Sequence, residues 1–563
     1  ANNATGVNNT IVGYQAGNGA HGNSHNGNAF FGHRAGFTIT TGQANVALGQ
    51  QSSQNITTGI RNTVVGNTAH YRNSTGGYNV AIGYTAGREH IGSNAVLIGN
   101  EAGYYATASA NVFVGYHAGK GSDSEPYSSG GKNVGVGYES QKNFTTGNQN
   151  TSLGHQSLRA NSTGANNTAV GYRALYGSSG NSTNSNVAVG DTALSNISSG
   201  GYSVAIGHQA LEGLTSGNYS VGVGFRAGQY NIGSNNVLIG FSAGNGSSGN
   251  TTAGGMTAVG RESFASVTTG GSNIGLGYRA GYSVTTGATN IAIGIEAMRN
   301  AVSPGSSVAI GGYAGYNIKA GGTGIVHVGH NAGVYASGSN NTFIGYESGR
   351  GGTTSAPFST GTDNVAVGRN ALRLFTSGNT NVAVGVYASD ALTTATLSTA
   401  VGPYAASNVT TAGGFAALGY KAGAAQVDHG NFVAIGYEAM GGTATTNQGN
   451  GIAIGYRAQF QVKDGSSGVA VGNSALENLV GQYSTALGDE SGRYASGSYN
   501  TFVGNKAGKG GTTSAPFSSG KQNTALGADA LKGFTTGGYN TAIGKQAGQA
   551  ITTANYNTFV GAW

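Results

Sequence analysis

Residues able to do chemistry are sparse in this sequence and do not gather. The 563 residues include 11 His, 19 Asp or Glu and no Cys. The histidines occur singly, without an HExxH motif or a His/Asp/Glu cluster that would hold a metal ion. Polar runs such as Arg88-Glu89-His90 are interpreted as solvated corners, and the scattered acids give no carboxylate pair for glycoside cleavage. We therefore expect no enzyme activity, no metal and no cofactor.

Other binding chemistries are equally weak in the sequence. The Gly275-Leu276-Gly277 pair belongs to a repeat and opens no helix, so it does not indicate a dinucleotide site. The net charge of +7 is spread thinly, which predicts no nucleic-acid partner. No apolar run approaches the roughly 18–20 residues of a membrane span. We expect no membrane-spanning segment.

Tyrosine is the one functional side chain that recurs at a fixed place. It follows a repeated glycine in ten copies, among them Tyr84, Tyr116 and Tyr437. A column of stacked rings would bury area between neighbouring coils, which is a structural role. The same column could bind sugars, and both interpretations stay open.

These residues are positioned by one short phrase, most clearly Asn79-Val80-Ala81-Ile82-Gly83-Tyr84-Thr85-Ala86-Gly87. This motif occurs in 32 copies. We call its first glycine, Gly83 in this copy, the marker glycine; the marker glycines run from Gly13 to Gly561. Of the 31 steps between marker glycines, 17 are 17 residues long and six are 16. A short period held this long is typical of a solenoid.

The phrase itself predicts a strand. The residue one before the marker glycine is aliphatic in 31 copies and Phe31 in the other, Val, Ile or Thr dominates three before it, and a small residue stands between them. This alternation indicates a β-strand with one buried face. We place Val80 and Ile82 inside, Ala81 on an outer packing face and Thr85 in water.

Turn residues precede the strand. Gly stands seven before the marker in 22 copies, as in Thr58-Gly59, and suggests a corner with positive φ. Asn stands four before the marker in 20 copies. Stacked coils would join these amides in a hydrogen-bonded ladder, although Asn also suits left-handed turns. A weaker second strand completes each coil.

The predicted fold is therefore all-β, a parallel β-solenoid of about 32 coils with a dominant 17-residue period. We expect one continuous domain over residues 1–563. Because each coil has only a thin core, side-by-side association is favoured.

Four inserts interrupt the rhythm, near residues 120–132, 244–256, 349–363 and 508–522. Three carry an aromatic tip, and before each insert the normally small position is bulky: the tips are Tyr127, Phe358 and Phe517, and the bulky residues are Phe113, Leu238, Phe343 and Phe502. Either the aromatic tip folds back as a lid over the bulky residue, or it contacts a ligand, as loops on rigid scaffolds often do.

The phrases Asn79-Val80-Ala81-Ile82-Gly83 and Ser203-Val204-Ala205-Ile206-Gly207, followed by x-x-Ala, resemble the head repeats of YadA-type trimeric autotransporter adhesins. Similar arrays occur in phage tail fibres. The resemblance implies a left-handed β-roll, assembled as a homotrimer. It also implies a non-enzymatic rod of an adhesin or tail fibre, located outside the cell, on its surface or on a virion. Its partners would be copies of itself and a glycan or protein receptor on a host surface.

Two alternatives remain. The sequence starts and stops within a repeat and shows no cap, which predicts either a truncated chain or ends that stack head to tail into a filament. An ice-binding solenoid is suggested by pairs such as Thr40-Thr41, but adjacent threonines point to opposite faces of a strand.

Overall fold

The computed structural model describes residues 5–178, 180–247, 251–318, 322–355, 358–428, 430–442, 450–461, 467–515 and 517–562. The chain forms two compact units, Ala1–Arg279 and Ala280–Trp563, and each is described on its own. Both units are all-β parallel solenoids, and no helix occurs among the described residues. The predicted fold class is thus confirmed, whereas a single domain over residues 1–563 stays a prediction.

Each coil contributes one three-residue strand. The first unit holds β1 (Thr10–Val12), β2 (Ala29–Phe31), β3 (Val46–Leu48), β4 (Thr63–Val65), β5 (Val80–Ile82), β6 (Val96–Ile98), β7 (Val112–Val114), β8 (Val134–Val136), β9 (Thr151–Leu153), β10 (Thr168–Val170), β11 (Val187–Val189), β12 (Val204–Ile206), β13 (Val221–Val223), β14 (Val237–Ile239), β15 (Thr257–Val259) and β16 (Ile274–Leu276). The second unit holds β17 (Ile291–Ile293), β18 (Val308–Ile310), β19 (Val326–Val328), β20 (Thr342–Ile344), β21 (Val365–Val367), β22 (Val382–Val384), β23 (Thr399–Val401), β24 (Ala416–Leu418), β25 (Val433–Ile435), β26 (Ile452–Ile454), β27 (Val469–Val471), β28 (Thr485–Leu487), β29 (Thr501–Val503), β30 (Thr524–Leu526), β31 (Thr541–Ile543) and β32 (Thr558–Val560).

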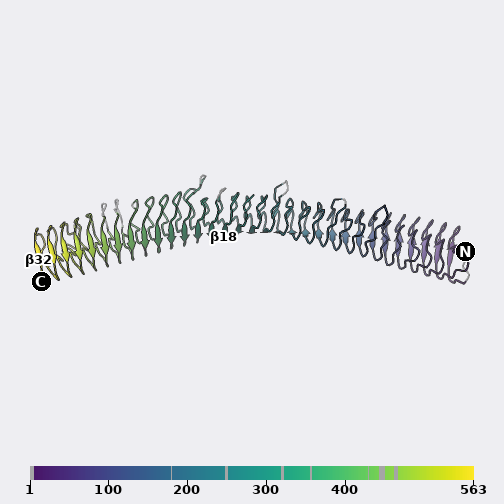
Figure 1. The fold of residues 1–563 in the computed structure, drawn as a ribbon, viewed down its shortest axis with the longest axis horizontal. Coiled ribbons are helices and arrows are strands. Elements are labelled where there is room, and N and C mark those ends of the chain that lie inside the picture. The colour runs from purple at the N-terminus through teal and green to yellow at the C-terminus, as the bar shows by residue number, and fades with distance from the viewer. Residues whose placement is uncertain are drawn as a thin grey trace. The chain divides into compact units, whose positions relative to one another are not determined.

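Strands of successive coils pair in parallel and in register. Between β5 and β6, for example, Val80 lies opposite Val96 and Ile82 opposite Ile98. Within each unit the strands follow one another in a row in chain order (Figure 1). The expected second strand is wrong: turns fill that side, and the described residues there contain only isolated bridges such as Ala106 with Ser128.

The marker glycines form the tightest contact in the stack. Gly83 has φ +139°, and a Cβ added there would lie 2.3 Å from the carbonyl oxygen of Gly99 in the next coil. The other marker glycines have φ between 125° and 142°. Glycine is therefore required twice, by the backbone angle and by the close approach of the next backbone.

The corner glycine seven residues before the marker has a different role from the one expected. Gly59 is not among the residues with positive φ. A Cβ on Gly59 would instead lie 2.6 Å from the carbonyl oxygen of Gly76, its equivalent in the next coil. Close stacking of backbones, rather than a left-handed turn, selects glycine at this corner.

The predicted asparagine ladder is confirmed. Asn62 is fully buried, and its backbone nitrogen and its Nδ2 both donate to Oδ1 of Asn45, each at 3.0 Å. Nδ2 also donates to the carbonyl oxygen of the corner Gly76 at 3.0 Å. The amide column thus ties each strand entry to the preceding coil and to the glycine corner of the following one.

The strand faces are the reverse of the prediction. Ala81 is fully buried, whereas Ile82 is 37% exposed and Val80 is half-buried. In all strands but the first and last the middle residue is buried, so the small position lines the core. The interior of a coil is narrow, because the tight turns lie directly opposite the strand, and it admits alanine more readily than valine or isoleucine.

The residues two before and four after a marker glycine face each other across the core, and in neighbouring coils bulk can pass from one position to the other. Phe343, two before its marker glycine, faces Gly349, where an added Cβ would lie 2.3 Å from the ring. In the next coil the residue two before the marker glycine is Ala366 and the residue four after it is Leu372, and both are fully buried. A bulky residue is thus accommodated wherever its partner is glycine.

We predict that Gly83→Ala destabilises the stack by more than about 3 kcal/mol, because the new Cβ meets a backbone carbonyl at a φ that L-residues avoid. Thermal unfolding and hydrogen exchange of the coils around residues 65–99 measure the effect. The matched control is Gly305→Ala, whose Cβ would meet only the Thr323 methyl at 3.5 Å. Equal effects of the two substitutions would contradict the role of the marker column.

Candidate functional site

The aromatic tips of the inserts stack on surface tyrosines. Tyr127 lies on Tyr105, with ring centroids 5.2 Å apart. Phe358 and Phe517 repeat the contact on Tyr335 and Tyr494, at 6.1 and 6.2 Å. Each tip is half-buried.

The bulky core residues are covered by other rings. Phe113 packs on Phe144 at 5.4 Å, and the same contact joins Phe343 with Phe375 and Phe502 with Phe534. Each partner comes from the coil after the insert and is fully buried or nearly so. Phe144, Phe375 and Phe534 thus cover the bulky rings, and whether Tyr127, Phe358 and Phe517 act as additional lids or as ligand contacts stays a prediction. Leu238 is likewise fully buried, beside Gly244.

A buried hydroxyl anchors each insert. Ser128 Oγ donates to the Phe144 carbonyl at 2.6 Å and accepts from the Ser122 backbone nitrogen at 2.8 Å. Ser359 and Thr251 make the equivalent bonds to the carbonyls of Phe375 and Val267. Residues 248–250, 356–357 and 516 of the predicted inserts lie outside the described residues.

The first insert, which is described throughout, borders a polar cleft of about 490 Å³. Its walls are Lys120 to Asp123 from the insert, Lys142, Asn143 and Thr145 from the next coil, and Ser162 and Gly180 beyond them. Burial raises the pKa of nearby Glu139, but hydrogen bonds from Lys142, Arg159 and Gln156 outweigh burial and lower it to about 2. The carboxylate is therefore charged at neutral pH and neutralises Lys142.

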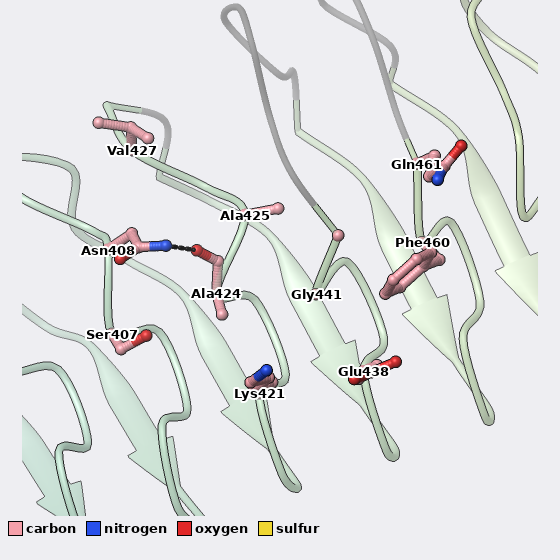
Figure 2. A pocket seen from close by; sticks show the side chains of 11 residues that line it. Ser407, Asn408, Lys421, Ala424, Ala425, Val427, Glu438, Gly441, Phe460 and Gln461 are labelled. Carbon is pink, nitrogen blue, oxygen red and sulfur yellow. Dashed lines mark hydrogen bonds between the residues drawn. The ribbon is translucent and has the colours of Figure 1, made fainter.

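A larger pocket of about 550 Å³ lies between coils of the second unit (Figure 2). Asn408 Nδ2 donates to the Ala424 carbonyl at 2.7 Å on one wall. Lys421 and Glu438 are its charged lining residues, and Phe460 lies beneath Arg457 at 3.9 Å. These groups do not converge on one point, so the pocket indicates no reaction.

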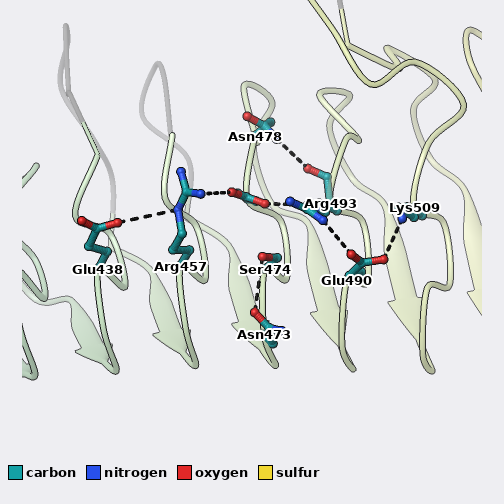
Figure 3. A network of polar contacts seen from close by, with 9 residues as sticks. Glu438, Arg457, Asn473, Ser474, Asn478, Glu490, Arg493 and Lys509 are labelled. Atoms are coloured by element: carbon teal, nitrogen blue, oxygen red, sulfur yellow. Dashed lines mark hydrogen bonds and ion pairs between the residues drawn. The ribbon is translucent and has the colours of Figure 1, made fainter.

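Charged residues form ladders along the coils. In the second unit, Arg493 contacts Glu477 and Glu490 at 2.6 Å each, and Lys509 contacts Glu490 at 2.6 Å (Figure 3). Hydrogen bonding from Lys509 is the main cause that lowers the pKa of Glu490. Alternating signs neutralise one another, so this face presents no strong field of either sign.

The residue two after the marker glycine is less solvated than predicted. Thr85 is only 6% exposed, and this position adopts φ near +55° in most coils. The left-handed backbone directs side chains along the stack toward the neighbouring coil. Arg226 Nε, for example, donates to Gln209 Oε1 at 2.8 Å.

Tyrosines stack in two columns beside the strands. Tyr437, just after a marker glycine, lies between Tyr420 and Tyr456 at 5.0 and 5.4 Å. Five residues before the markers, Tyr202 stacks on Tyr219 at 5.3 Å. The structural interpretation of the column fits this geometry, and sugar binding by it stays a prediction.

Several histidines lie in the core. His90 is fully buried and stacks on His70 at 5.5 Å, and Glu89 is 4% exposed, so the interpretation of Arg88-Glu89-His90 as a solvated corner is wrong for two of its residues. His327 is also fully buried, 4.9 Å from Phe343. His327 is the middle residue of β19, two before Gly329, where most other coils have a buried alanine. Its position in the repeat is the sequence feature that could have predicted its burial.

No group of three or more potential metal ligands occurs among the described residues. Within that same part of the chain, no helix is long and apolar enough to cross a membrane. A comparison with protein-family models finds no match, and a comparison with curated proteins finds no significant similarity.

We predict that Phe375→Ala destabilises the second unit by about 3–5 kcal/mol, because it removes a fully buried ring. Phe358→Ala should cost only about 1 kcal/mol, since that ring is half-buried on the surface. Chemical denaturation of both variants measures the difference. A larger loss for Phe358→Ala would support the lid interpretation.

We also predict that acid weakens the coils around His327. Burial lowers the pKa of His327 from 6.5 to about 3, so below pH 6.5 the unfolded chain binds a proton that the folded chain does not. Stability should therefore be full above pH 6.5 and fall by about 1.4 kcal/mol per pH unit below it. Denaturant unfolding at pH 7 and pH 5 tests this. In His327→Phe, a phenyl ring would face Gly333 in the same way that Phe343 faces Gly349. This variant should lose this part of the pH dependence. An unchanged slope of stability against pH would contradict the assignment to His327.

Proposed function

We propose that this chain is a non-enzymatic structural rod that associates side by side with copies of itself and carries binding loops, as in an adhesin or a tail fibre. Such a role places it outside the cell, on a cell surface or on a virion. The observation that supports the proposal best is the outward face of the strands.

Along each unit that face exposes apolar side chains, which we call the aliphatic row. It consists of the residue one before each marker glycine, which is aliphatic or Phe31, and of the residue three before it wherever that residue is Val or Ile. Its most exposed internal members are Leu48, Leu153, Leu526, Ile206, Val46 and Leu418, at 40–50%. Exposed tyrosines such as Tyr84 and Tyr202 flank it on both sides. An apolar surface of this extent marks an interaction site.

Copies of this chain are the partner that fits the aliphatic row. The row repeats once per coil, at a spacing fixed by parallel strand pairing, roughly 4.8 Å. A second rod has the same spacing and can match the row coil by coil, whereas a globular partner would cover only a few coils. The homotrimer implied by the resemblance is the expected assembly.

The inserts would supply the binding function of such a rod. Their tips are stacked aromatic pairs on rigid coils, and binding residues are concentrated on loops held by a scaffold. A host-surface glycan or protein is the proposed receptor. Because the described residues hold no metal-ligand group and no convergent catalytic set, we propose no reaction.

We predict that the purified chain is an oligomer and that Leu153→Lys with Ile206→Lys weakens its association at least tenfold, since burying charge in an apolar contact is costly. Sedimentation velocity and native mass spectrometry measure the mass. The control, Ile91→Lys with Tyr230→Lys, adds the same charge at exposed apolar residues outside the row. A monomeric wild-type chain would refute lateral association, and rods that lengthen end to end would favour the filament alternative.

A further inference from the structure

The cleft beside the first insert combines features that the other inserts lack. Asn143, in the coil after the first insert, lines the cleft. In the coils after the third and fourth inserts the equivalent residues, six after the marker glycine, are Leu374 and Gly533. The volume of about 490 Å³ is that of a small-molecule site. We therefore considered which ligand chemistry its lining would recognise.

The cleft is polar but nearly balanced in charge. Lys120 Nζ lies 2.6 Å from Glu101, and Lys142 Nζ lies 2.6 Å from Glu139. Each ammonium has three donors and so retains two for a ligand. The exposed Asp123 adds acceptors on the same rim. Arg159 also contacts Glu139, at 2.7 Å. Three cations beside three carboxylates do not favour an anionic ligand.

Asn143 offers both kinds of hydrogen-bonding group. Its side chain is half-buried, and within the described residues it makes no hydrogen bond to the protein. An amide supplies two donors and one acceptor within a small space. This combination matches neighbouring hydroxyl groups, each of which donates and accepts.

An aromatic pair, Tyr105 and Tyr127, lies next to insert residues that line the cleft, although neither tyrosine is itself a lining residue. The Tyr105 backbone nitrogen donates to the Lys120 carbonyl at 2.7 Å, which fixes Tyr105 beside the cleft wall. Tyr127 stacks on Tyr105 and is itself half-buried. A large ring with a polar hydroxyl suits a ligand that has one apolar face and a polar perimeter.

We propose that this cleft binds a neutral oligosaccharide. The C–H face of one sugar ring packs on Tyr127, and its hydroxyls exchange hydrogen bonds with Asn143, Asp123 and the free donors of the two lysines. The proposal rests on the proposed role of the rod as a carrier of binding loops and assigns a ligand class to one of them.

The test is binding of the full-length chain to an array of neutral, sialylated and sulfated oligosaccharides. We expect binding to neutral members, and a loss of at least tenfold in Tyr127→Ala and in Asn143→Ala. Ile91→Ala is the control, because it removes an exposed apolar side chain outside the inserts and outside the aliphatic row, and it should bind as the wild type does. Asn143→Ala breaks no internal hydrogen bond, so its thermal unfolding should be unchanged even if Tyr127→Ala weakens the insert.

Absence of binding to any neutral oligosaccharide overturns the proposal, as does undiminished binding by both variants. Preference for sialylated or sulfated members overturns the neutral ligand class. Sedimentation of the same samples separates this result from the proposed function. An oligomer that binds no glycan refutes only the cleft, and a monomer that binds neutral glycans refutes only the association.

Discussion

The close approach of marker glycines is the constraint on which the rest of each unit depends. Their φ near +130° turns the chain out of the strand, and their backbones leave no room for a Cβ between coils. The strand can therefore be only three residues long before the turn begins. The asparagine ladder supplies the complementary contact at the strand entry, where each amide satisfies buried backbone groups that a short strand leaves unpaired.

A coil built this tightly has a small interior, and the core sequence follows from it. Alanine lines most of the strand side, and a ring is admitted where the facing turn residue is glycine, as Gly349 is for Phe343. In the next coil the bulky residue is Leu372 on the turn side, and Phe375 of that coil packs against the ring of Phe343. The inserts sit after such coils, and beside three of them the ring that covers the enlarged core comes from the following coil.

The sequence was sufficient for the solenoid, the strand positions and the asparagine ladder, because each depends on a residue type at a fixed spacing. It was misleading about the two strand faces. Hydrophobicity places Val80 and Ile82 inside, yet the width of the coil reserves the interior for Ala81. The rings that contact Phe113 and Tyr127 could not be predicted from the sequence, because Phe144 and Tyr105 come from neighbouring coils and meet them only when the coils stack.

Because the aliphatic residues lie outside, each unit exposes apolar surface to solvent along its strand face. A thin core stabilises each coil only modestly, and the area that would normally be buried inside a domain is left on one face. The charged ladders and the inserts are built from residues that follow the marker glycines, whereas the aliphatic row precedes them. The self-association and the ligand binding that we propose would therefore use different residues of a coil, and a substitution in one set need not disturb the other.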